Sequence, residues 1–226
     1  LGIKHPILLA PMAGVSTPLL AAEVSNQGAL GALGLGANTI DSALQQIQET
    51  QALTPHPFQL NFFCHESTAL NTESNTLWSQ HLAAEFKKFG VNPPTELKCI
   101  YPSFKDNDDF LNLCLDTQPK AVSFHFGIPH QYQIQKLKQA GIITLVSATN
   151  LTEALAIEEA GIDIIVAQGI EAGGHRGIFN AQIDGAIKTS DLVTLIKKHS
   201  SLPVVAAGGI MNGQQAKAML NLGADA

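Results

Sequence analysis

A repeated helix-to-strand junction constrains the fold of this chain more than any other feature of its sequence. Three segments with helical spacing each end in a glycine that apolar residues follow, at Ala140-Gly141-Ile142, Ala160-Gly161-Ile162 and Leu222-Gly223-Ala224. Glycine is common just after a helix, because it adopts the left-handed conformation without strain. Short apolar runs alternate with helical patterns along the chain, and this alternation predicts a parallel sheet.

Seven short apolar runs are predicted as strands, at residues 6–10, 29–34, 58–62, 121–126, 142–147, 163–168 and 203–207. By the same rule Gly223 leads into an eighth strand near Ala224, and because the chain stops at Ala226 we expect that strand to be missing. Eight strand–helix units form a TIM barrel, whose active site lies at the carboxyl ends of the strands. We therefore predict an α/β fold, a (β/α)8 TIM barrel truncated before strand eight. It forms a single domain over residues 1–226, with an irregular insertion at about 63–105.

An open, doubly wound sheet is the alternative architecture. No G-x-G-x-x-G pattern follows the first predicted strand, which weakens a dinucleotide-binding version of that fold.

The sequence also marks where three of the predicted helices begin. Thr17 precedes Pro18 as an N-cap, Asn150 and Glu153 have the spacing of a capping box, and Asn212 is expected to cap the last helix.

Charge and cysteine usage exclude several classes of protein. The net charge of −6 and the absence of a Lys/Arg run argue against a nucleic-acid surface. Cys64, Cys99 and Cys114 lack metal-binding spacing, and an odd number of cysteines indicates reduced thiols. The sequence has neither a signal peptide nor an apolar run of bilayer length. We expect a cytoplasmic protein without metal, nucleic-acid or membrane partners, either a monomer or a homodimer.

Polar side chains lie where the predicted strands end. Because these ends meet on one face of a barrel, we expect the groups to converge there. Side-chain amides donate and accept hydrogen bonds, which suits the edge of a flavin ring. Backbone at Met12 and Ala13 and at Gly208 and Gly209 offers close approach at two further strand ends, and the second pair suits a phosphate. The polar residues are Asn61, His125, Ser147 and Gln168.

Residues 168–177, Gln-Gly-Ile-Glu-Ala-Gly-Gly-His-Arg-Gly, follow a predicted strand and place an acid, an imidazole and a guanidinium close together. Glycines such as Gly173 and Gly174 let backbone N–H groups approach a ligand and form a concave anion site. The ordinary alternative is a mobile surface loop.

Each candidate side chain also has a structural interpretation. Asn61 and Gln168 can serve as amides that brace loops, and Tyr101 can serve in simple packing. His125 can be a core histidine whose hydrogen bonds are satisfied. Strand alternation places His125 with Ser123, opposite Phe124 and Phe126, which favours the barrel interior.

Together these motifs resemble those of bacterial nitronate monooxygenases, formerly called 2-nitropropane dioxygenases. The resemblance implies a TIM barrel that holds FMN non-covalently and without metal. It implies oxidation of alkyl nitronates, such as propionate 3-nitronate, by O2 to a carbonyl compound and nitrite. The family continues beyond this sequence with a Gly-Thr motif that helps to hold the FMN phosphate. The matching motifs are Ala10-Pro11-Met12-Ala13-Gly14 with Ser16-Thr17-Pro18, Asn61-Phe62-Phe63, Ser123-Phe124-His125-Phe126-Gly127, residues 168–177, and Ala206-Ala207-Gly208-Gly209-Ile210.

Residue by residue, the resemblance makes His125 the catalytic histidine and assigns Tyr101 and His175 to the substrate pocket. With an ordinary pKa of about 6.5, an imidazole donates to nitronate oxygens or acts as a base towards a neutral nitroalkane. We expect His125 to do the first, with the second left open as a further role, and Arg176 to brace its loop. The resemblance implies FMN contacts at Met12, Ala13, Asn61, Gln168, Gly173, Gly174, Gly208 and Gly209.

Two kinds of rival function remain at this stage. An FMN-dependent enoyl-acyl-carrier-protein reductase is similar in its barrel and Ala-Gly-Gly-His loop but needs NAD(P)H, and residues 11–18 and 123–127 favour the monooxygenase. From a different class, the chain could be a non-catalytic barrel that binds a phosphorylated ligand. A poorly folded fragment is a further alternative, since an unclosed barrel exposes two strand edges.

Overall fold

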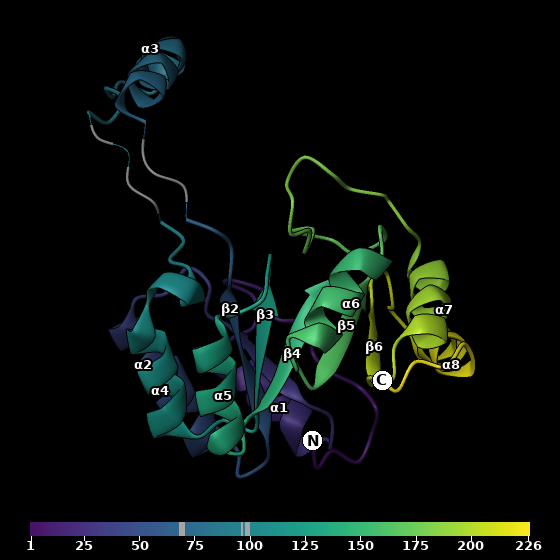
Figure 1. Ribbon diagram of the computed structural model, residues 1–226. Helices are drawn as coiled ribbons and strands as arrows, with labels where there is room; N and C mark the ends of the chain where they lie inside the picture. The colour runs from purple at the N-terminus through teal and green to yellow at the C-terminus, as the bar shows by residue number, and fades with distance from the viewer. Residues whose placement is uncertain (68–70, 96, 98–99) are drawn as a thin grey trace.

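The computed structural model describes residues 1–67, 71–95, 97 and 100–226, and in these it contains one parallel sheet of six strands. The strands follow one another in the order β1-β2-β3-β4-β5-β6 (Figure 1). A doubly wound sheet would reverse its strand order, so the predicted α/β barrel architecture is confirmed in the form of a half-barrel. The strands are β1 Gly31–Gly34, β2 Phe58–Phe63, β3 Ala121–His125, β4 Ile143–Ala148, β5 Ile164–Gln168 and β6 Val204–Ala207.

Helices connect successive strands and cover the outer face of the curved sheet, as Figure 1 shows for α4, α5 and α6. The predicted N-caps are confirmed: the side chains of Thr17, Asn150 and Asn212 each accept a hydrogen bond from the first turn of their helix. The helices are α1 Pro18–Asn26, α2 Ile40–Leu53, α3 Thr72–Lys88, α4 Asp108–Thr117, α5 Gln131–Gln139, α6 Leu151–Glu159, α7 Thr189–His199 and α8 Gly213–Asn221, with the short 3-10 helix η1 Phe104–Asp106.

The predicted capping box at α6 is wrong in its second half. The Glu153 carboxylate does not accept from the Asn150 amide; its Oε2 accepts from the amide and hydroxyl of Thr149, at 2.7 and 2.9 Å. Its Oε1 accepts from the amide of Phe179 at 2.9 Å. The buried Glu153 carboxylate therefore fixes the loop after β5 to the end of β4.

The two ends of the described sheet show partial pairing. The predicted strand at residues 6–10 is reduced to one parallel bridge between Leu8 and Leu30, because the donor position after Leu9 is Pro11, which has no amide hydrogen. Beyond β6, the amide of Asp225 donates to Val204 O at 2.7 Å, and Ala226 O accepts from Ala206 N at 2.8 Å. These bonds begin a parallel pairing where the sequence predicts a strand near Ala224.

The two faces of the sheet differ in chemistry. Side chains that point towards the helices are apolar and form the main core, among them Leu60, Phe62, Phe124, Val146 and Ile165. On the inner face, Ala121, Leu145, Ile164 and Val205 form a smaller apolar cluster. Further along the same strands, the inner face becomes polar towards the carboxyl ends, where the candidate site lies.

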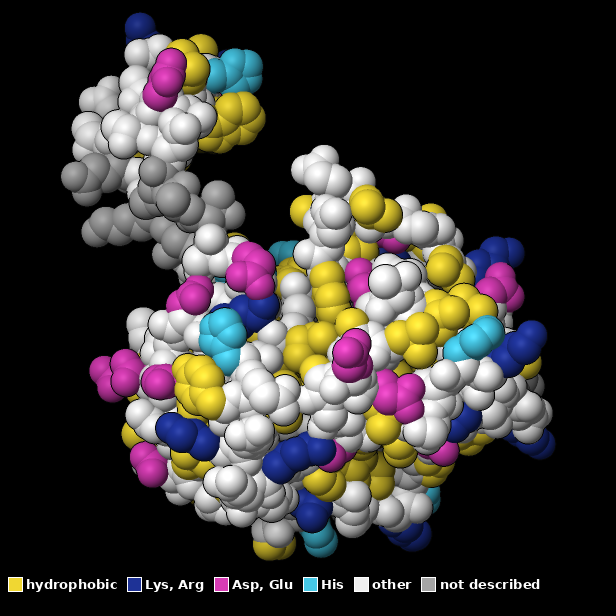
Figure 2. All heavy atoms as spheres, in the orientation of Figure 1, with side chains coloured by type: hydrophobic (Ala, Val, Ile, Leu, Met, Phe, Trp, Pro, Cys, Tyr) yellow, Lys and Arg dark blue, Asp and Glu magenta, His cyan; other side chains and the backbone are white. Residues whose placement is uncertain are grey.

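The predicted irregular insertion contains α3, which has no buried residues. Figure 1 shows α3 standing away from the sheet and its helices. Its Leu77 and Trp78, and Phe89 after it at 82% exposure, are exposed large apolar side chains. Figure 2 shows apolar side chains on the surface of this protruding segment. Whether the chain forms one domain stays a prediction.

Cys64 and Cys114 are free thiols in the interior, and burial raises the pKa of both well above its ordinary value. Both are therefore protonated and inert in the folded protein. Cys99 lies outside the described residues. In the described part of the chain, no helix combines the length and apolarity needed to cross a bilayer.

Candidate active site

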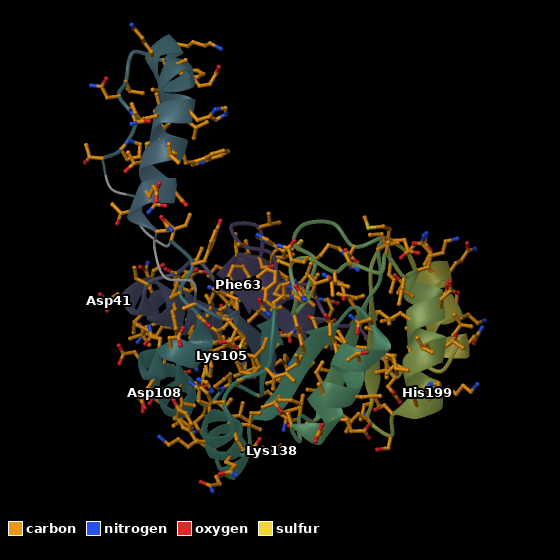
Figure 3. All side chains as sticks on the ribbon, turned by 45° about the horizontal axis from the view of Figure 1, so that its top comes forward. Asp41, Phe63, Lys105, Asp108, Lys138 and His199 are labelled. Atoms are coloured by element: carbon orange, nitrogen blue, oxygen red, sulfur yellow. The ribbon has the colours of Figure 1, made fainter. Side chains whose placement is uncertain are left out.

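The carboxyl ends of β2 and β3 gather a cluster of rings around His125. Phe63 pairs with His125 in the register of the two strands, and Figure 3 shows it at this edge of the sheet. Phe63 lies 5.6 Å from Tyr101 and 5.5 Å from His175, measured between ring centroids. The cluster brings together His125, Tyr101 and His175, which are far apart in the sequence and were predicted as site residues.

Phe126 overturns one expectation from strand alternation. The sequence places it opposite His125, but β3 ends at His125 and Phe126 has a φ of +74°. This turn brings its ring to 4.6 Å from the His125 ring and 5.5 Å from His175. A left-handed conformation is costly for a bulky residue, and such strain is concentrated at functional sites. Phe126 therefore belongs to the ring cluster around His125, although strand alternation predicts it on the opposite face of the sheet.

Both ring nitrogens of His125 have partners. Nδ1 lies 3.0 Å from Ser147 Oγ, and Nε2 lies 3.1 Å from the carbonyl oxygen of His175. A carbonyl oxygen only accepts, so Nε2 carries the hydrogen and Nδ1 accepts from the Ser147 hydroxyl. The arrangement selects the tautomer in which Nε2–H donates to the carbonyl oxygen of His175.

His125 is a neutral donor at physiological pH. Burial lowers its pKa from 6.5 to about 4, with the hydrogen bond to His175 O opposing this and the positive charge of Arg176 adding to it. The expectation that His125 has an ordinary pKa of about 6.5 is therefore wrong for this buried position. A neutral imidazole with so low a pKa is a weak base but still a hydrogen-bond donor.

Gln168, the last residue of β5, uses its amide to hold the loop of residues 169–188. Its Nε2 donates to His175 O at 3.0 Å, and its Oε1 accepts from the amide of Gly177 at 2.7 Å. His175 O thus receives hydrogen bonds from both His125 and Gln168. In this structure Gln168 braces a loop, and its contact with FMN stays a prediction.

Arg176 braces the same loop, as expected from the sequence. Its Nη1 donates to Gly169 O at 2.6 Å and to Gln168 O at 3.1 Å. Its Nε forms an ion pair with Asp184 at 2.9 Å, and both side chains are largely shielded from solvent. Because the guanidinium is used internally, Arg176 is not available to bind an anion at the mouth of the site.

Gly177 is a close-approach position that sequence analysis did not single out. A Cβ atom there would lie 2.8 Å from His125 Cε1 and 2.9 Å from Ser147 Cβ. Only glycine lets the loop pack directly on the histidine. No local signal in the sequence marks this contact, because it joins β3, β4 and the loop after β5.

Asn61 and the loop with Met12 and Ala13 lie at neighbouring strand ends. Asn61 is buried, and its Nδ2 donates to Ser123 Oγ at 2.9 Å and to Ser123 O at 3.2 Å. A Cβ at Gly34, the end of β1, would lie 3.0 Å from Ala13 N. The Met12 amide donates to Ser16 Oγ at 2.9 Å, which fixes this loop over the strand.

The glycine pairs predicted to contact a cofactor differ in their surroundings. Gly173 and Gly174 have no atom within 4 Å of a Cβ built on them, so this part of the loop faces open space. Gly208 and Gly209 follow β6 with φ angles of +132° and +67°. That turn packs on Thr189, at the start of α7, and on Glu171.

Comparison with known proteins agrees with this arrangement. A family model described as nitronate monooxygenase matches residues 1–226. The nitronate monooxygenase of Paraburkholderia phytofirmans is 51% identical over 227 residues, which cover 100% of this chain and 62% of that protein. The chain therefore spans less than two thirds of the length of this relative.

Two solved structures are similar in fold as well. Nitroalkane oxidase from Streptomyces ansochromogenes superposes with a TM-score of 0.88 at 40% identity, covering 100% of this chain and 64% of that one. FabK from Thermotoga maritima gives a TM-score of 0.72 at 29% identity, covering 99% of this chain and 57% of that one. From its motifs, its fold and these matches, the chain belongs to the nitronate monooxygenase family.

Proposed function

We propose that this protein oxidises alkyl nitronates, such as propionate 3-nitronate, with O2 in an FMN-dependent reaction that yields a carbonyl compound and nitrite. The observation that carries the proposal is the cluster at the carboxyl ends of the strands, where His125, Tyr101 and His175 meet. The match to the nitronate monooxygenase family supports the same chemistry.

The residues at these strand ends fit FMN. The left-handed turn at Gly208 and Gly209 suits the phosphate, since its two glycines have no side chains of their own to block approach to the backbone amides. Met12, Ala13, Asn61 and Gln168 lie at the ends of strands on the same edge, where they would contact the ring system. Gly173 and Gly174 leave open space on the loop above. When bound, FMN supplies the electron acceptor for the nitronate.

The chain's own residues bind and orient the nitronate anion. His125 Nε2–H is the donor for a nitronate oxygen, which takes the place of the His175 carbonyl oxygen now 3.1 Å away. Tyr101 and His175, with Phe63 and Phe126, form aromatic walls beside the anion, and bound FMN and substrate would displace water from between them. Excluding water strengthens the hydrogen bond from His125.

The state of His125 favours an anion that is already formed. Its pKa of about 4 makes the imidazole a poor base for removing a proton from a neutral nitroalkane. Donation through Nε2–H needs no such proton transfer. We therefore propose the nitronate as the substrate, with a cytoplasmic location and a monomeric or dimeric state as parts of the proposal still to be measured.

An absorption spectrum of the purified protein with FMN, before and after anaerobic addition of propionate 3-nitronate, tests the function. Loss or shift of the flavin bands on mixing is expected. Flavin bands that do not change with the nitronate but bleach with NAD(P)H and an enoyl thioester would indicate an enoyl reductase instead. Binding of a sugar phosphate by a protein without affinity for FMN would replace it with a non-catalytic barrel.

A further inference from the structure

Glu171 joins three segments that meet beside the glycine turn after β6. It belongs to the loop after β5, yet its Oε2 accepts from the backbone amide and from the hydroxyl of Thr189, both at 2.8 Å. Thr189 is the first residue of α7, and the N-cap residue Lys188 makes no side-chain capping bond. Glu171 therefore caps α7 from a position 18 residues earlier in the chain.

Thr189 in turn is enclosed by glycines of two different loops. It is 3% exposed. A Cβ at Gly169 would lie 2.1 Å from Thr189 Oγ1, and one at Gly208 would lie 2.6 Å from the same atom. The turn after β6 thus packs directly on the side chain that Glu171 holds.

The second glycine of the turn contacts Glu171 itself. A Cβ at Gly209 would lie 3.0 Å from Glu171 Cβ. The Thr189 hydroxyl has a single proton, and the carboxylate at 2.8 Å competes for it with Gly208 O at 3.2 Å. A charged acceptor at the shorter distance wins, so the carboxylate fixes the orientation of the hydroxyl beside the turn.

We propose that Glu171 is a positioning residue for the flavin phosphate: through Thr189 it holds the turn of Gly208 and Gly209 in its phosphate-binding conformation. This inference rests on the proposed function, because it takes FMN as the ligand of that turn. The amide end of α7 and Lys188 offset part of the negative charge that the carboxylate brings near the turn. The pKa of Glu171 lies below its ordinary value, because the Thr189 hydrogen bonds and Lys188 outweigh the burial that acts to raise it.

Dissociation constants for FMN and for riboflavin, which lacks the phosphate, test this role. In E171A we expect FMN affinity to fall about tenfold or more and riboflavin affinity to change less than about twofold. E171Q keeps an oxygen acceptor for Thr189 and should bind FMN more tightly than E171A. Glu159→Ala, which removes an exposed acid from α6, is the matched control and should leave both affinities unchanged.

Three results would overturn the proposal. E171A could bind FMN as tightly as the unaltered protein, or it could lose FMN and riboflavin affinity equally, which indicates general loosening. E171Q could bind FMN more tightly than the unaltered protein, which indicates simple repulsion by the carboxylate.

Hydrogen exchange in the flavin-free protein separates this inference from the proposed function. We expect the amides of Gly208 and Gly209 to exchange faster in E171A than in the unaltered protein. In the Glu159→Ala control these amides should exchange at the same rate as in the unaltered protein. Unchanged exchange in E171A would overturn the positioning role even if FMN binds. If the unaltered protein fails to bind FMN, the proposed function is contradicted, and the exchange result alone decides whether Glu171 holds the turn.

Discussion

Ser147 Oγ lies 3.0 Å from His125 Nδ1 and donates its proton there, so that the opposite nitrogen of the ring keeps its hydrogen and donates it to the carbonyl oxygen of His175. The two residues come from adjacent strands, β3 and β4, which share a fixed register. Backbone hydrogen bonds of the sheet therefore set the orientation of the imidazole.

Replacing Ser147 tests the importance of this contact. S147A removes the donor to Nδ1 and lets the ring rotate or change tautomer, so kcat/KM for propionate 3-nitronate should fall about fivefold to tenfold, the usual range for one lost hydrogen bond. S147T keeps the hydroxyl and should recover most of the activity. Equal kinetics for S147A and the unaltered protein would show that the contact is dispensable.

The depressed pKa of His125 predicts a pH dependence of stability. Between about pH 4 and 6.5 the unfolded chain binds a proton at this residue and the folded protein does not, so the free energy of unfolding should rise with pH across that range. The contribution over the whole range is about 3 kcal/mol. Urea denaturation of the unaltered protein and H125N from pH 4.5 to 7.5 measures it, and the variant should show a shallower slope. Parallel slopes would contradict the buried, neutral state of His125.

The close packing at Gly177 predicts a large effect of one added methyl group. In G177A the new Cβ would clash with His125 and Ser147, so the free energy of unfolding should fall by about 1–3 kcal/mol. Gly185→Ala, in the same loop, is the control, because its Cβ would meet Ile187 at an ordinary 3.6 Å. Thermal denaturation measures the stability of both variants. Similar losses of stability in the two would show that the loop does not pack on the histidine as described.

We predict that the contacts of Arg176 stabilise the loop of residues 169–188. R176A removes the shielded ion pair with Asp184 and the bonds to Gly169 O and Gln168 O, so backbone amides of this loop should exchange hydrogen faster. Lys88→Ala serves as the control, since its ion pair with Glu85 is exposed on α3 and contributes little. Exchange in R176A that matches the Lys88 variant would rule out a bracing role.

Features set by local sequence were predicted well. Thr17 and Pro18 fix the start of α1 by residues next to each other in the chain, and Gly141 and Gly161 have the positive φ angles that their junctions imply. Alternation of short apolar runs with helices was enough to predict the barrel architecture. The grouping of Tyr101 and His175 with His125 came from resemblance to a family, since no spacing in the sequence relates them.

Features set by tertiary contacts were not predictable from the sequence. The capping-box pattern suggested a local role for Glu153, but its second oxygen holds Phe179, 26 residues away. Alternation failed at Phe126, because the strand ends one residue earlier and the chain turns inward. The pKa of His125 depends on burial by a loop that begins 44 positions later, after Gln168.

The most direct test of the account is the reaction of H125N with propionate 3-nitronate, measured as O2 consumption together with the FMN content of the same sample. We predict that FMN content is unchanged while kcat falls by about a hundredfold or more, because the shorter asparagine side chain places no N–H donor at the position of Nε2 and the flavin site is kept. Turnover equal to that of the unaltered protein, at the same FMN content, would contradict the assignment of His125 as the catalytic residue.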